Sequence, residues 1–163
     1  MRSTSSPAPR LVRSFIQDIR APLEQVFPLL CPEREKEWLP GWDARMIHSA
    51  SGVAEHGAVF ETQHEAGRTL WIVTEYEPPR RVAFARWQPD GVVVHIQITL
   101  ERKHADATAV GIIYTYTGVD ENGVAVVAGM REDAWLKTMA FWQESMNTWF
   151  ENHPPGRVAA AIR

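Results

Sequence analysis

The sequence predicts an α+β fold in which a curved antiparallel sheet packs against one long C-terminal helix. Short segments with strand-like alternation follow one another between residues 43 and 119, and turn residues such as Pro89-Asp90-Gly91 separate them. Strands joined by short turns pair antiparallel. The last third of the chain instead carries large apolar side chains at alternating spacings of four and three, which is one face of an α-helix. This stripe consists of Trp135, Met139, Trp142, Met146 and Trp149.

The opposite face of that helix is polar, so the stripe is the side that covers the sheet. It carries Arg131, Glu132, Lys137, Gln143 and Glu144, which we expect to be solvated. Tryptophan and methionine fill space irregularly and adapt to their surroundings. The stripe therefore fits either a filled helix-on-sheet core or a sheet that leaves a ligand cavity beside the helix.

A first strand and two short helices precede the other strands. Alternation predicts a strand over Leu11–Arg20, and Pro22 suits the first turn of a helix over Pro22–Leu30. Cys31-Pro32 interrupts that helix. A second, highly charged helix is expected over Pro32–Trp38, and Leu39-Pro40-Gly41 ends it.

Six further strands complete a sheet of about seven. They are expected over Asp43–Ser49, Ala58–Glu65, Arg68–Glu77, Arg81–Gln88, Val92–Arg102 and Thr108–Val119. Ala66-Gly67 is predicted as a hairpin turn, and residues 120–123 as a loop. The final helix is expected to start between Val124 and Met130 and to end near Asn152.

Length and composition favour one domain of ordinary size. We expect a disordered leader over residues 1–10, a domain over 11–153 and a tail over 154–163. The net charge of −3, without a basic run, argues against nucleic acid as a partner. No signal peptide or membrane-spanning run is visible, and the lone Cys31 fits a reducing compartment, so a cytoplasmic location is expected. Seven tryptophans suggest large interior contacts or an aromatic pocket.

Three segments resemble those of a known superfamily. Ile19–Phe27 (IRAPLEQVF) is similar to its first strand and helix entry, and Tyr76–Phe84 (YEPPRRVAF) to its Glu-Pro-Pro turn before a strand carrying Phe. Arg34–Trp42 (REKEWLPGW) is similar to a signature of an uncharacterised subgroup. With the element order, these segments resemble the START/SRPBCC or helix-grip superfamily over about residues 11–152. That superfamily includes polyketide cyclases, plant pathogenesis-related allergens and lipid-transfer domains.

The resemblance implies a cavity between the sheet and the last helix. Alternation places Phe84, Val94, Ile96 and Ile98 inward, and Arg86 shares the parity of Phe84. The register at Trp71, Tyr114 and Tyr116 stays open. The cavity candidates are Trp38, Trp42, Phe60, Trp71, Phe84, Arg86, Val94, Ile96, Tyr114, Tyr116, Trp135, Met139, Trp142 and Met146. Among them, Trp38 and Trp42 form either a lid or a plug, and the tyrosines either meet a ligand or only pack.

No catalytic set is recognisable, and no metal or cofactor is expected. His48, His56 and His64 recur every eight residues, and on strands and turns this spacing does not indicate a metal site. His95 is expected to be solvated, and Cys31 to be inert. Arg86 lies either in water at the edge or rim of the sheet, or inside the cavity. An internal guanidinium must be paired by a carboxylate or by an acidic ligand. The candidate carboxylates are Glu61, Glu75 and Glu144.

Three functions remain open from the sequence. The favoured one is binding or transport of a small hydrophobic or aromatic molecule in the internal cavity. The second is a polyketide cyclase or aromatase in which Arg86, Tyr114, Tyr116 and possible acid–base residues His64 or His95 meet in that cavity. The third is a co-chaperone-like interaction module that docks through Glu33–Glu37. Homodimerisation through an edge strand is compatible with all three.

Overall fold

The structure is a computed structural model that describes residues 7–154. The predicted leader and tail therefore lie largely outside the described residues. The strands are β1 (Arg10–Ile19), β2 (Ala44–His48), β3 (Val59–His64), β4 (Gly67–Glu77), β5 (Arg81–Gln88), β6 (Val92–His104) and β7 (Ala107–Gly118). The helices are α1 (Leu23–Val26), η1 (Phe27–Leu30), α2 (Pro32–Glu35), α3 (Glu121–Ala128) and α4 (Glu132–Asn152).

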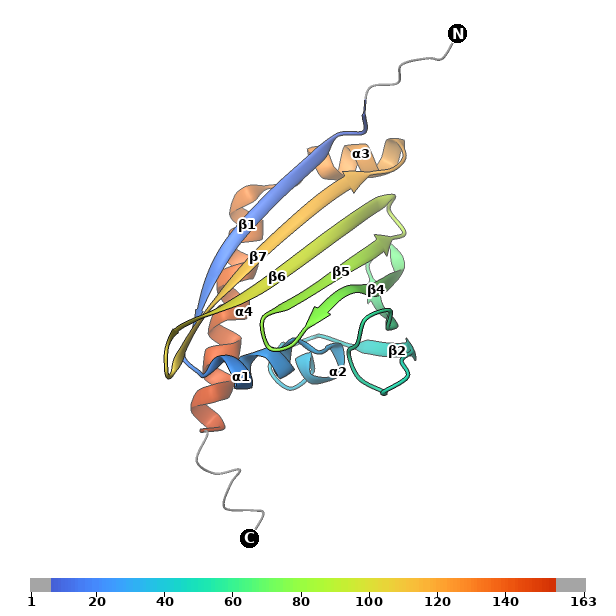
Figure 1. Cartoon of the computed structure of the whole chain (residues 1–163). Coiled ribbons are helices and arrows are strands. Elements are labelled where there is room, and N and C mark those ends of the chain that lie inside the picture. The colour runs from blue at the N-terminus through green and yellow to red at the C-terminus, as the bar shows by residue number, and fades with distance from the viewer. Residues whose placement is uncertain (1–6, 155–163) are drawn as a thin grey trace.

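All seven strands form one antiparallel sheet in the order β1-β7-β6-β5-β4-β3-β2 (Figure 1). The strand predictions are correct to within about two residues at each end, because alternation and turn residues fix them locally. The hairpin between β3 and β4 differs slightly. His64 pairs with Gly67, so its turn residues are Glu65 and Ala66.

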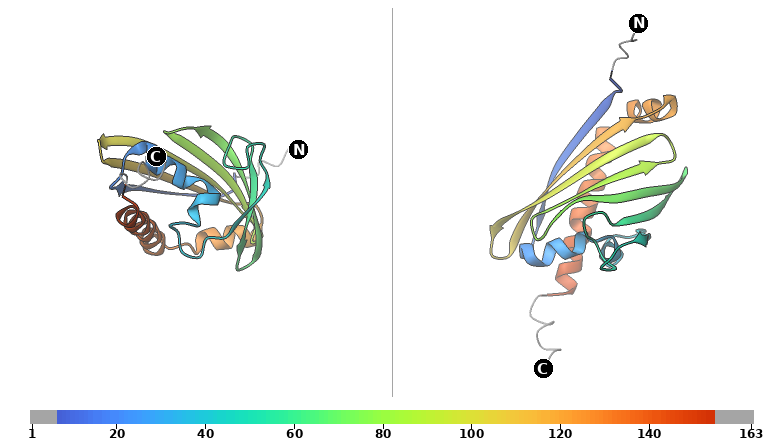
Figure 2. Two further views of the ribbon diagram at one scale, coloured as in Figure 1. Left: turned by 90° about the horizontal axis from the view of Figure 1, so that it is seen from below. Right: turned by 45° about the vertical axis from the view of Figure 1, so that its right-hand side comes forward.

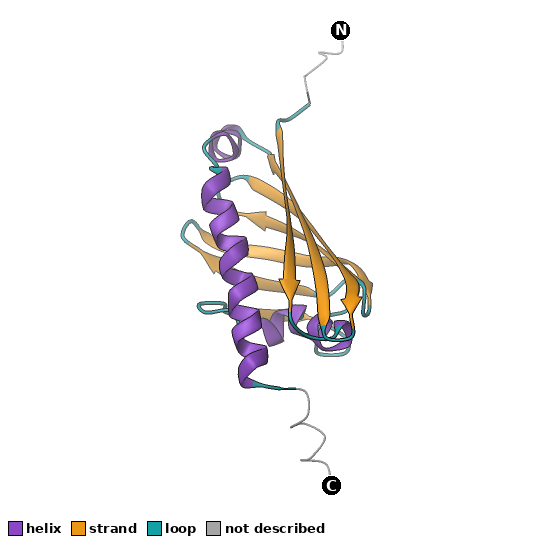
Figure 3. Cartoon of the chain, turned by 90° about the vertical axis from the view of Figure 1, so that its left-hand side faces the viewer, coloured by secondary structure: helices purple, strands orange, loops and turns teal. Residues whose placement is uncertain are grey.

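The α+β arrangement with a long C-terminal helix is confirmed. Helix α4 runs along the inner side of the curved sheet (Figures 2 and 3). Helix α3 lies near one end of α4, and α1, η1 and α2 lie at the opposite end (Figure 3). The buried face of β6 consists of alternate residues from Val92 to Leu100, as the sequence predicts.

Polar side chains fix α4 to the edge strand β1. The Gln143 side-chain oxygen accepts a hydrogen bond from the backbone N–H of Asp18 at 2.8 Å. Asn147 donates to the Asp18 carbonyl at 2.9 Å and accepts from the backbone N–H of Arg20 at 2.8 Å. Gln17 in turn donates to the Met139 carbonyl at 3.0 Å. We call these contacts the α4–β1 clamp. The bonds from Gln143 and Asn147 satisfy backbone groups on the free edge of β1, where no neighbouring strand can pair with them. Gln143 was expected to be solvated, and this expectation is wrong because its side chain binds β1.

Helix α3 begins at Glu121, whereas the sequence predicted a loop over residues 120–123. Asp120 caps this helix, because its carboxylate accepts a hydrogen bond from the backbone N–H of Gly123 at 2.7 Å. Asn122 and Gly123 are poor helix formers, so the sequence did not indicate that Asp120 is the N-cap of a helix. The chain then breaks at Gly129 and Met130, so the predicted single helix is in fact two.

Gly123 allows α3 to pack directly on the β5–β6 turn. A Cβ atom at this position would lie 1.7 Å from the carbonyl oxygen of Gly91, which is backbone and cannot move aside. We expect Gly123→Ala to lower the free energy of unfolding by about 2–3 kcal/mol in urea denaturation. Gly129→Ala is the matched control, since the nearest atom to its Cβ would be the Ala125 carbonyl oxygen at 3.5 Å, an ordinary van der Waals distance. Equal stability of the two variants would contradict this packing.

The α4–β1 clamp predicts a large effect for a residue that contacts no ligand. Asn147 is 4% exposed, and its loss leaves the Asp18 carbonyl and the Arg20 N–H without their partner. We expect Asn147→Ala to lower the free energy of unfolding by about 2–3 kcal/mol. The exposed neighbour Thr148 provides the control, and Thr148→Ala should change stability by less than about 0.5 kcal/mol.

Candidate functional site

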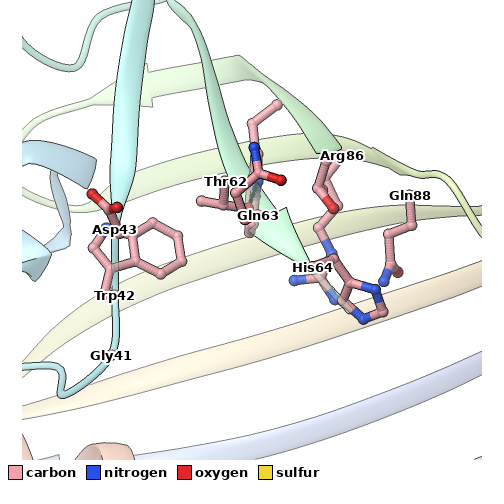
Figure 4. A pocket seen from close by; sticks show the side chains of 10 residues that line it. Gly41, Trp42, Asp43, Thr62, Gln63, His64, Arg86 and Gln88 are labelled. Atoms are coloured by element: carbon pink, nitrogen blue, oxygen red, sulfur yellow. Dashed lines mark hydrogen bonds between the residues drawn. The ribbon is translucent and has the colours of Figure 1, made fainter. Parts of the chain in front are cut away.

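Three hollows meet at Arg86, on the inner side of the sheet. An inner cavity of about 90 Å³ lies between the sheet, α4 and the segment that contains α2. A mouth of about 260 Å³ opens beside β3 and β5. Figure 4 shows this mouth, with Trp42 and Asp43 on one side and His64, Arg86 and Gln88 on the other. A third hollow, a side groove of about 370 Å³, runs between β7 and the first turns of α4. Arg86 lines all three.

Two tryptophan side chains hold the segment from Leu29 to Trp42 against the cavity. The Trp38 indole N–H donates to the Leu29 carbonyl at 2.8 Å, and the Trp42 indole N–H to the Pro32 carbonyl at 2.9 Å. Gly41 has a φ of +79°, a backbone conformation that turns the chain sharply before Trp42. Trp38 is buried and only lines the inner cavity, whereas half-buried Trp42 lines both the cavity and the mouth. The geometry places Trp38 as a plug and Trp42 at the entrance.

Aromatic rings fill much of the space beside α2. Trp71 stacks on Phe60 with ring centroids 5.2 Å apart, and Phe84 meets both rings edge-on at 6.1 Å. Trp42 adds an edge contact to Trp71 at 5.7 Å. The inner cavity is therefore smaller than the roughly 150 Å³ that accommodates benzene, whereas the mouth exceeds it. The sequence left a filled core and an open cavity as alternatives. The interior is partly filled by aromatic rings and keeps a small cavity, so it is intermediate between the two.

The Arg86 guanidinium lies between two aromatic rings. It is 5.0 Å from the Trp71 ring centroid and 5.6 Å from that of Tyr114, within the range of cation–π attraction. Its Nε is buried without a hydrogen-bond partner, and Arg86 forms no ion pair within residues 7–154. None of the carboxylates expected to pair with it does so. Glu61 pairs instead with Arg45 and Arg68, Glu75 pairs with Arg81, and Glu144 is exposed to solvent.

Glu35 also faces the inner cavity, which the sequence analysis did not predict. Removal of its carboxyl from water raises the pKa of Glu35 to about 8. Its neighbours Glu33 and Glu37 instead pair with Lys36 and Arg34 outside the cavity. The segment 33–37 is therefore no uniformly solvated charged patch. A signal was present, because Glu35 shares helical spacing with Pro32, Trp38 and Leu39.

The two tyrosines of β7 face inward, and burial raises the pKa of both hydroxyls. The positive charge of Arg86 opposes that rise in each case. Tyr114 lines both the inner cavity and the side groove, whereas Tyr116 lines only the groove. The side chains of both stay neutral near pH 7 and are available as hydrogen-bond donors.

The structure brings most of the predicted cavity residues together. Those that line the inner cavity are Trp38, Trp42, Phe60, Trp71, Phe84, Arg86, Ile96, Tyr114 and Trp142. Tyr116, Trp135 and Met139 line the side groove instead. Val94 and Met146 line none of the three hollows and are buried in the core. The lining residues that the sequence analysis missed are Gln17, Leu30, Pro32, Glu35, Leu39 and Ile112.

The remaining polar candidates do not converge. His64 lines the mouth, but His95 is exposed on the outer face of the sheet, as predicted. Cys31 is half-buried, and its sulfur accepts a hydrogen bond from the backbone N–H of Ala54. Within residues 7–154, no three His, Cys, Asp or Glu side chains are grouped to hold a metal ion. None of the helices in that range is long and apolar enough to cross a bilayer.

Solved structures with the same architecture identify the fold. Norcoclaurine synthase from Thalictrum flavum, solved with dopamine and hydroxybenzaldehyde, superposes with a TM-score of 0.65 at 13% identity, covering 90% of this chain and 89% of that chain. A hypothetical protein from Helicobacter pylori gives 0.66 at 16% identity, covering 91% and 96%. The chain has the helix-grip fold. DynU16, a putative protein of the dynemicin biosynthetic locus, gives 0.57 at 18% identity, covering 84% of this chain and 47% of that chain.

These similarities confirm the fold that the START/SRPBCC resemblance implies. No protein-family model matches the sequence, and no curated protein sequence matches it either. At such low identities a helix-grip domain shares architecture with its neighbours and not necessarily chemistry. The function therefore has to be argued from the site itself.

The position of Glu35 predicts a loss of stability as the pH rises. The ordinary pKa of a glutamate is 4.5 and that of folded Glu35 is about 8, so between these values the folded state binds a proton that the unfolded state has released. Raising the pH through this interval therefore favours unfolding. We expect this residue to remove about 2–3 kcal/mol of stability between pH 6 and pH 9.

Urea denaturation of Glu35→Gln checks this expectation, since the variant should lack that part of the pH dependence. The exposed Glu37 of the same segment supplies the control, and Glu37→Gln should keep the wild-type dependence. An unchanged pH profile in Glu35→Gln would show that the carboxyl is not held in the cavity.

Proposed function

We propose that this protein binds a small aromatic molecule with an anionic or carbonyl oxygen, and that the inner cavity and the mouth together form the binding site. The observation that carries this proposal is the unpaired guanidinium of Arg86 at the junction of the hollows. A half-buried cation without a carboxylate partner favours an acidic or polar ligand atom beside it. Arginine also presents several donors in a fixed planar array, which suits a carboxylate.

The walls around Arg86 favour an aromatic ligand. Trp42 and Trp71 line both the inner cavity and the mouth, so a flat molecule that enters through the mouth would contact their rings. Stacked and edge contacts between rings add to the stabilisation from apolar burial. Because the inner cavity is narrow, we expect the ring of the ligand to lie at the entrance between cavity and mouth.

The fold neighbours are compatible with this proposal. Norcoclaurine synthase was solved with two aromatic molecules, dopamine and hydroxybenzaldehyde. Docking through residues 33–37 is less well supported, because the charges of Glu33 and Glu37 are paired within the segment and Glu35 faces the cavity.

A matched pair of probes tests the role of Arg86. We expect phenylacetate to shift the indole N–H signals of Trp42 and Trp71 in ¹H–¹⁵N NMR spectra, and the uncharged phenylacetamide to bind more weakly. Arg86→Met keeps an unbranched apolar stem against the two rings but removes the charge. It should weaken phenylacetate binding at least about tenfold, since hydrogen bonds to charged groups contribute about 1.5–3 kcal/mol.

Arg81→Met on the same strand provides the control. Arg81 pairs with Glu75 and lines none of the three hollows, so its loss should leave the affinity unchanged. If neither probe binds more tightly than millimolar, the proposed binding function is wrong. If phenylacetate binds equally well to Arg86→Met, the assigned role of Arg86 is wrong.

A further inference from the structure

Glu35 is the feature that a simple binding site does not explain. Glu35 is half-buried and lines the inner cavity together with Arg86 and Tyr114. Its side chain forms no hydrogen bond and no ion pair within residues 7–154. An unpaired carboxyl in an apolar cavity opposes folding and weakens the binding of apolar molecules. Stability and apolar binding would both be better with a leucine or glutamine, so the carboxyl points to another role.

The surroundings of Glu35 leave it able to gain and lose a proton near neutral pH. Desolvation raises the pKa of this carboxyl to about 8. The other titratable or charged side chains that line the cavity are Arg86 from β5 and Tyr114 from β7. The remaining lining is apolar apart from the amide of Gln17 and the indoles of the tryptophans. A proton-transfer residue works best when its pKa is close to the pH at which it acts.

We propose that Glu35 is a catalytic acid–base residue that moves a proton at the carbon next to the carbonyl group of a bound aryl ketone, while Arg86 binds the carbonyl oxygen. This inference rests on the proposed function, because it uses the same cavity and the same role of Arg86. It adds the substrate class and a reaction, the reversible removal of an α-proton through an enolate. The arrangement supplies the two groups that such a step needs, a base beside the carbon and a cation beside the oxygen.

The proposed step balances without a further reactant. The ionised carboxylate of Glu35 takes a proton from the α-carbon of the ketone. The electrons of the broken C–H bond form the new C=C bond, and the carbonyl π electrons move onto the oxygen. The N–H groups of Arg86 stabilise the resulting enolate, and the neutral Tyr114 hydroxyl is a second donor on the same wall. Return of the proton from Glu35 to carbon restores the ketone.

Hydrogen–deuterium exchange detects this step directly. In D₂O, deuterium from solvent reaches Glu35 through the mouth and is returned to the α-carbon, so the CH₂ signal of phenylacetone in the ¹H NMR spectrum is lost with time. We expect the wild-type protein to accelerate this loss at least about tenfold over buffer. The accelerated rate should rise with pH up to about 8, as the fraction of ionised Glu35 increases.

Two variants separate the role of Glu35 from a general effect of the protein. Glu35→Gln keeps the shape but cannot accept a proton, so it should return exchange to the buffer rate while phenylacetone still shifts the Trp42 and Trp71 indole signals. Glu37→Gln, on the same segment but exposed, should keep the wild-type rate. Because the half-buried carboxyl of Glu35 has no partner within residues 7–154, its replacement should leave the fold intact, and urea denaturation of each variant checks this.

The outcomes distinguish this inference from the proposed function. If phenylacetone binds and exchange is no faster with wild type than with Glu35→Gln, the catalytic role is overturned and the binding function stands. If phenylacetate binds but phenylacetone does not, the ketone substrate class is overturned, again with binding intact. If neither probe binds, both proposals fail together.

Discussion

The α4–β1 clamp determines the shape of the interior. Gln143 and Asn147 satisfy backbone groups of an edge strand, and Gln17 reaches back from that strand to the backbone of α4. These bonds hold the long helix at one side of the sheet. The curved sheet and α4 leave the inner cavity between them, and side chains from β3, β4 and β5 line it. The site is a consequence of this offset between helix and sheet.

Aromatic side chains fill that space and hold Arg86 within it. Phe60, Trp71 and Phe84 pack on one another, and the guanidinium of Arg86 lies between Trp71 and Tyr114. Cation–π contacts stabilise the guanidinium without using its hydrogen-bond donors. The N–H groups of Arg86 therefore remain available, which an internal ion pair would not allow.

The segment from Leu29 to Trp42 gives the cavity its acidic group. Two indole hydrogen bonds hold the fold of this segment, which lines the cavity with Glu35, while Glu33 and Glu37 pair with Lys36 and Arg34. Glu35 from α2 and the guanidinium of Arg86 from β5 thus line one largely apolar cavity. Polar groups of opposite charge type that line a largely apolar cavity are typical of positions where charge develops on a bound molecule.

The sequence by itself determined the strands, the order of the elements and the inward face of β6, because alternation and turn residues act over a few neighbouring positions. It also placed Phe84 and Arg86 on one face. It did not reveal that Asp120 begins a separate helix, that Asn147 binds β1, or that Glu35 faces the cavity. Those features depend on contacts between residues far apart in the chain, such as Asn147 with Asp18. Only the tertiary structure decided that Arg86 lacks an internal carboxylate, because Glu61 and Glu75 find other arginines on neighbouring strands.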